Sequence, residues 1–119
     1  MAIDQPYAAA GVPFPDGRQV AGLSKDQTNA LIQQSIQPGD TAPTLNGRAL
    51  TADIIPYLAQ DAIFTLDQLT TLNQADPHGL LTGRLDVQRA GIFGVSLGGI
   101  TLSEACRLEP RFRACLVRS

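Results

Sequence analysis

The sequence predicts an α/β protein, and the order of its apolar segments leads to that prediction. A helical pattern over 53–73 is followed by an apolar strand over 90–95, a helix over about 100–108 and a second apolar strand over 112–117. Short connections between such elements favour right-handed crossovers between parallel strands. We therefore expect a parallel sheet with crossover helices.

The helix over 53–73 is predicted by apolar residues that recur every three or four positions from Ile54 to Leu72. Pro56 is tolerated in a first turn, so this helix should begin near Asp53. A turn around His78 then ends the segment.

The first half of the chain gives weaker signals. Residues 2–4 suggest the stump of a strand, and prolines and glycines then predict irregular structure to about Arg18. A helix is expected over 26–36, capped by Ser24 or Asp26, with a loop over 38–48. We interpret 19–50 as a loop or lid-like insertion.

The run from Ala90 to Val95 is continuously apolar, which is typical of a strand buried on both faces of a parallel sheet. It leads into Gly94-Val95-Ser96-Leu97-Gly98, a G-x-S-x-G motif with a strand before it and a helix after it. A chance match in a chain of this length has a probability of about 4%. The motif therefore indicates a nucleophile elbow.

The elbow pattern assigns a task to each residue. Ser96 is the expected nucleophile, held in a strained backbone conformation at the carboxyl end of its strand. Gly94 and Gly98 should approach each other so closely that side chains would collide, and Gly98→Val should cost several kcal/mol. The N–H of Leu97, at the helix N-terminus, is the expected first oxyanion donor.

The stretch 83–99, together with Pro110-Arg111-Phe112-Arg113-Ala114, resembles the platelet-activating factor acetylhydrolase family and related bacterial and fungal lipases and esterases. Residues 2–7, 14–18 and 61–69 agree with this resemblance. It implies a partial α/β-hydrolase fold over 1–119, with the elbow and the following strand in 83–119. It also implies a serine esterase acting through an acyl-enzyme, with Gly94, Val95, Ser96, Leu97, Gly98 and Gly99 forming the elbow.

The sequence departs from the family pattern in three places. Val95 and Gln5 stand where the family often has histidine, and Ser119 stands where its catalytic aspartate would end the strand. In this fold the acid and the histidine follow the serine. We therefore expect a central fragment that is inactive alone. His78 is interpreted as a solvated loop residue, and Glu104 and Glu109 as residues of the helix after the elbow.

The composition argues against two classes of binding partner, nucleic acids and membranes. A net charge of −2 gives no electrostatic basis for binding nucleic acid, and no apolar run is long enough to span a membrane. A small-molecule or lipid ester is the expected substrate, without metal or cofactor, and exposed sheet edges favour self-association. We expect Cys106 and Cys115 to be free core cysteines.

Two alternatives stay open. A non-catalytic or degenerate α/β-hydrolase module would share the elbow but lack the rest of the triad. A peptidase or acyltransferase on the same fold would differ in pocket loops.

Overall fold

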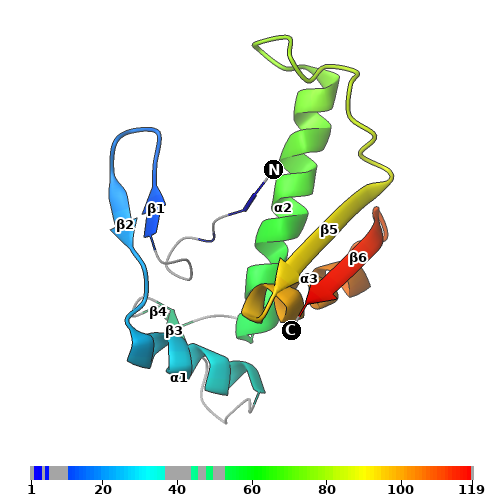
Figure 1. The fold of residues 1–119 in the computed structure, drawn as a ribbon. Helices are drawn as coiled ribbons and strands as arrows, with labels where there is room; N and C mark the ends of the chain where they lie inside the picture. The colour runs from blue at the N-terminus through cyan, green and yellow to red at the C-terminus, as the bar shows by residue number, and fades with distance from the viewer. Residues whose placement is uncertain are drawn as a thin grey trace. The chain divides into compact units, whose positions relative to one another are not determined.

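A computed structural model of the protein describes residues 2–3, 5, 11–36, 44–45, 48–49 and 53–118 (Figure 1). The chain divides into two compact units, Met1–Tyr57 and Leu58–Ser119. The elements in chain order are β1 (Gly11–Pro13), β2 (Gln19–Ala21), α1 (Lys25–Ile36), β3 (Thr44–Leu45), β4 (Arg48–Ala49), α2 (Ile54–Gln74), β5 (Ala90–Val95), α3 (Leu97–Leu108) and β6 (Phe112–Arg118).

The first unit contains an antiparallel hairpin where irregular structure was expected. Strands β1 and β2 pair with Val12 opposite Val20. Gly17 supplies a positive φ of 83° in the connecting turn, and the Asp16 carboxylate accepts hydrogen bonds from the Arg18 backbone and guanidinium at 3.0 and 2.6 Å. The turn glycine and the local ion pair therefore favour a hairpin. Its strands lack the long alternation of apolar and polar residues by which a strand is predicted from sequence.

Helix α1 begins one residue before the expected start, and Ser24 is its cap. The Ser24 hydroxyl accepts the Gln27 N–H at 3.3 Å, while the Gln27 side chain accepts the Ser24 N–H at 2.8 Å. This reciprocal pair is a capping box, which satisfies backbone donors that a helix start leaves free.

Two other expectations for the first half are wrong where the structure describes the chain. Ala2 and Ile3 lie outside any strand, and Asp4 falls outside the described residues. Within the expected loop over 38–48, β3 pairs with β4 in an antiparallel hairpin. Pairs of two-residue strands are too short to leave a periodic pattern in the sequence.

The second unit contains the predicted parallel sheet. Strands β5 and β6 are parallel, with Ile92 opposite Cys115 and Phe93 opposite Leu116. Helix α3 connects them, so the strand–helix–strand order expected from the sequence is confirmed. The chain is therefore of the α/β type in this half, with a sheet of two strands among the described residues.

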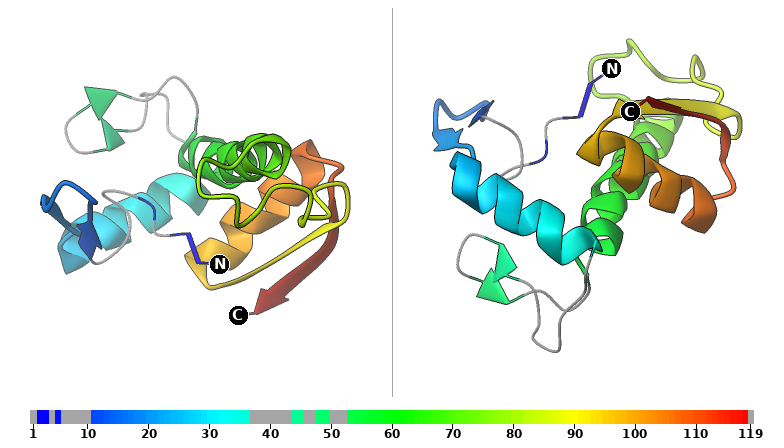
Figure 2. Two further views of the ribbon diagram at one scale, coloured as in Figure 1. Left: turned by 90° about the horizontal axis from the view of Figure 1, so that it is seen from above. Right: turned by 60° about the horizontal axis from the view of Figure 1, so that its bottom comes forward.

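Both helices of this unit pack on the same face of the sheet, as the view from above shows (Figure 2). Ala59 and Ala62 of α2 and Ala105 of α3 form a buried cluster, against which Ile92 and Phe112 pack. This cluster fixes the strands beneath the helices.

The expectation that β5 is buried on both faces is wrong. Its burial alternates along the strand, and Phe93 and Val95 are 76% and 55% exposed. Leu116, opposite Phe93, is 69% exposed. Because α2 and α3 cover one face, the side chains that point the other way stay in solvent. A continuous apolar run identifies the strand but does not show which faces are covered.

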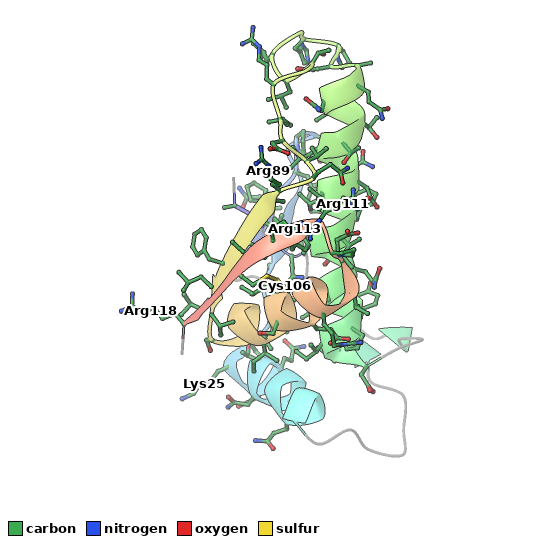
Figure 3. The ribbon with its side chains drawn as sticks, turned by 90° about the vertical axis from the view of Figure 1, so that its right-hand side faces the viewer. Lys25, Arg89, Cys106, Arg111, Arg113 and Arg118 are labelled. Carbon is green, nitrogen blue, oxygen red and sulfur yellow. A yellow bond between two sulfur atoms is a disulfide. The ribbon has the colours of Figure 1, made fainter. Side chains whose placement is uncertain are left out.

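Arg111 joins the start of β6 to helix α2 (Figure 3). Its guanidinium contacts the carboxylates of Asp67 and Glu109 at 2.6 and 2.8 Å and the Thr70 hydroxyl at 3.2 Å. The Arg111 side chain is 19% exposed, so these charge-assisted bonds form in a partly desolvated setting. Asp67 therefore belongs to a structural ion pair.

The prediction of free cysteines is wrong, because Cys106 and Cys115 form a disulfide. Cys106 lies on α3 and Cys115 on β6, with their Cα atoms 6.6 Å apart. After α3 the chain turns within three residues and returns beneath the helix, which brings together two residues nine positions apart. Spacing alone could not show that this turn brings the two side chains face to face.

In the described part of the chain, no helix has the length and apolarity needed to cross a membrane.

Candidate active site

Ser96 lies in the single-residue turn between the end of β5 and the start of α3. Its φ and ψ are 54° and −126°, and it is the sole non-glycine residue with positive φ in the described part of the chain. Such a conformation costs a side-chain-bearing residue about 1–3 kcal/mol. The expected strained strand-to-helix junction is therefore present, and Ser96 is exposed there.

The Ser96 backbone is held from two sides. Its N–H donates to the Arg118 carbonyl of β6 at 3.0 Å. Its carbonyl accepts the N–H groups of Gly99 and Ile100 at 2.9 and 3.2 Å, which begins the hydrogen-bond ladder of α3. The serine hydroxyl makes no capping bond to the helix. The backbone is thus fixed while the side chain is left available.

Gly94 is the position where the elbow has no room. A Cβ there would lie 2.5 Å from Leu102 Cδ2 and 2.6 and 2.7 Å from the carbonyl oxygen and carbon of Gly98. Two of these three contacts are with backbone, which cannot rotate away. The predicted close approach of Gly94 and Gly98 is therefore present.

The expectation that Gly98 is equally crowded is wrong. A Cβ on Gly98 would meet nothing within 4 Å. The two glycines differ because the carbonyl group of Gly98 faces Gly94, whereas a Cβ on Gly98 would point away from Gly94 into open space. Alanine at Gly98 should therefore be tolerated, whereas the γ-methyl groups of Gly98→Val reach beyond the space that a Cβ occupies.

Gly99 has a role that the sequence did not reveal. A Cβ there would lie 3.0 Å from Val117 Cγ1 and 3.3 and 3.4 Å from the carbonyl oxygens of Gly94 and Arg118. Helix α3 therefore sits against β6 at this glycine. A second glycine directly after Gly98 could have indicated close packing. That the packing partner is β6 depends on the tertiary fold.

Helix α3 presents free donors beside Ser96. The N–H groups of Leu97 and Gly98 precede the ladder that Gly99 begins, and first-turn N–H groups have no acceptor within their own helix. The positive end of the helix dipole adds to their attraction for negative charge. The role of the Leu97 N–H as an oxyanion donor stays a prediction.

The chain's single histidine lies in the segment that leads into β5. His78 is exposed in the segment between α2 and the start of β5, whereas Ser96 follows the end of β5 (Figure 1). The Asp76 carboxylate holds this segment by accepting the N–H groups of His78, Leu80 and Leu81. These bonds, that from His78 foremost, lower the pKa of Asp76. His78 thus occupies a turn of its own, apart from the elbow.

The glutamates after the elbow are engaged in ion pairs. Glu104 pairs with Arg107 on α3 at 2.7 Å, which lowers the pKa of Glu104. Glu109 pairs with Arg111 at 2.8 Å, and hydrogen bonds from the Arg111 side chain and backbone lower the pKa of Glu109 to about 2. Both carboxylates therefore serve the helix and its end, and Ser119 falls outside the described residues.

The described residues hold no cluster of three His, Cys, Asp or Glu side chains that could bind a metal ion. Comparison with protein-family models, curated proteins and solved structures found no match to this chain. The site is therefore defined by its own geometry: an exposed serine with strained backbone, two helix N–H groups without an intrahelical acceptor, and two glycines, Gly94 and Gly99, where a Cβ would be crowded.

Proposed function

We propose that Ser96 is the nucleophile of a serine carboxylic ester hydrolase and that β5, α3 and β6 are part of an α/β-hydrolase sheet. The main support for this proposal is the backbone conformation of Ser96, with φ 54° and ψ −126°, in the turn from a parallel strand to a helix. Strain of this kind persists only where surrounding structure enforces it, and it gathers at functional sites. Three contacts of a Gly94 Cβ under 3.0 Å show how tightly the turn is enforced.

The proposed reaction passes through an acyl-enzyme. The Ser96 oxygen forms a bond to the ester carbonyl carbon, the carbonyl oxygen becomes an oxyanion near the N–H of Leu97, and the alcohol leaves. Water then releases the acid and restores the serine. The resemblance to acetylhydrolases and lipases favours short-acyl or phospholipid-like esters as substrates. No cofactor takes part in this scheme.

A serine hydroxyl needs a base to accept its proton, and that requirement favours a second candidate function. His78 precedes β5 in the chain whereas Ser96 follows its last residue, and Glu104 and Glu109 are paired with arginines. A non-catalytic module that keeps the elbow geometry is therefore the alternative. The two candidates differ in whether Ser96 reacts when a base is supplied.

Labelling with a fluorophosphonate, with and without imidazole as an external base, distinguishes the two candidates. Without imidazole we expect slow or undetectable labelling of the chain. With imidazole, peptide mapping should find the label on Ser96, and Ser96→Ala should abolish it. Ser103→Ala is the matched control, because Ser103 is also exposed on α3 but donates its hydroxyl to the Gly99 carbonyl at 2.9 Å. Label spread over several serines without preference for Ser96 would refute the proposed function.

A further inference from the structure

The conformation of Ser96 depends on how α3 sits against β6. The Ser96 N–H donates to the Arg118 carbonyl near the end of β6, and Gly99 of α3 lies against Val117. A shift of the helix along the strand would lengthen that hydrogen bond and open the contact at Gly99. The position of the nucleophile is therefore set partly by a neighbouring strand.

The disulfide joins these two elements on the far side of the elbow. Cys106 lies two helical turns after Gly99, and Cys115 lies three residues before Arg118. A closed ring results, which runs from Ser96 along α3 to Cys106, across the disulfide to Cys115, and along β6 to Arg118. The hydrogen bond from Ser96 completes it. We call this the elbow ring.

Without the disulfide, the covalent link between α3 and β6 is the turn at 109–111. That turn is held at its other side by Arg111, whose partners Asp67 and Thr70 belong to α2. Arg111 therefore anchors the turn to α2. The disulfide instead anchors α3 directly to β6, whose Arg118 carbonyl accepts the Ser96 N–H.

We propose that the Cys106–Cys115 disulfide is a redox-controlled positioning device for Ser96. Cys115 is exposed, so a dithiol can reach it. One thiolate of the reductant attacks the Cys115 sulfur and releases the Cys106 thiolate, and the second thiol then closes the reductant's own disulfide and releases Cys115. Two cysteine thiols and one oxidised dithiol result, and the elbow ring is open.

Amide hydrogen exchange, followed by NMR on the oxidised and the dithiothreitol-reduced chain, tests this proposal. The reporters are the Ser96 and Gly99 N–H groups, which bond to the Arg118 and Ser96 carbonyls. The reference is the amide of Leu66, a buried residue of α2 outside the ring. We expect reduction to speed exchange at both reporters by about tenfold or more beyond any change at Leu66, as local opening would, with full reversal on reoxidation.

Each other outcome counts against the proposal. Unchanged exchange at Ser96 after reduction would show that the disulfide does not position it. Equal acceleration at Ser96 and Leu66 would show a general loss of stability.

The control is Cys106→Ser, which cannot form the disulfide. In this variant the reporters should exchange as in the reduced protein, and the reductant should have no further effect.

The consequence for reactivity rests on the proposed function. With imidazole present, fluorophosphonate labelling of Ser96 should be slower in the reduced than in the oxidised chain. Equal labelling rates would overturn the redox control of reactivity. If neither form labels at Ser96 while the exchange difference is found, the proposed function fails and the positioning role of the disulfide stands.

Discussion

Alanine at Gly94 should destabilise the protein, whereas alanine at Gly98 should not, although the two glycines are symmetric in the motif. The added methyl group at Gly94 would lie 2.5 Å from Leu102 Cδ2 and 2.6 Å from the Gly98 carbonyl oxygen. Leu102 is 3% exposed and has little space to move into. Relief requires the helix start to shift, and overpacking of this kind costs about 3 kcal/mol.

At Gly98 the same substitution meets nothing within 4 Å, and this residue lies in the first turn of α3 without a positive φ. Replacing a helical glycine with alanine restricts the unfolded chain and should stabilise the protein by about 0.5 kcal/mol. The two variants should therefore differ by about 3.5 kcal/mol in opposite directions from the parent.

Urea unfolding followed by circular dichroism measures both variants against the parent. Exchange protection of the Ser96 amide should fall in Gly94→Ala and persist in Gly98→Ala, because the crowding displaces the helix start. If Gly94→Ala unfolds within about 1 kcal/mol of Gly98→Ala, the elbow is looser than these distances indicate, and the steric reasoning is refuted.

Three further predictions concern the strain, the ion pairs and the disulfide. Ser96→Gly should raise the free energy of unfolding by about 1 kcal/mol over Ser96→Ala, since glycine relieves the positive φ; equal stabilities in thermal melts would argue against strain. The pKa of Glu109 is lowered to about 2 from its usual value of 4.5, so its pairing with Arg111 stabilises the fold above pH 4.5, and this contribution is lost as the pH falls toward 2. Melting temperatures of Glu109→Gln should therefore be lower at neutral pH and depend less on pH in that window, and an unchanged pH profile would contradict the pairing. Reduction of the Cys106–Cys115 bond should lower the free energy of unfolding by about 2.5 kcal/mol, as expected for so short a loop, and Cys106→Ser should show no response to reductant.

Local patterns in the sequence predict the helices and strands of the second half of the fold. The period of apolar residues located α2 and α3, and the apolar runs located β5 and β6, because helices and strands expose different faces at fixed intervals. The elbow was also readable, since the glycines around Ser96 are required by a turn that leaves no space for a Cβ at Gly94. Steric crowding in a turn and the periodicity of apolar residues depend only on residues that are close in the sequence, so both can be recognised from it.

Other features could not be predicted, because they depend on which segments meet in the folded chain. The hairpin of β1 and β2 rests on a turn glycine and a short ion pair, and the coverage of β5 on one face follows from the side on which α2 and α3 pack. The asymmetry between Gly94 and Gly98 depends on the direction of one carbonyl group. The disulfide and the bond from Ser96 to Arg118 join residues that only the return of β6 alongside β5 brings together, since neither contact leaves a periodic trace along the chain.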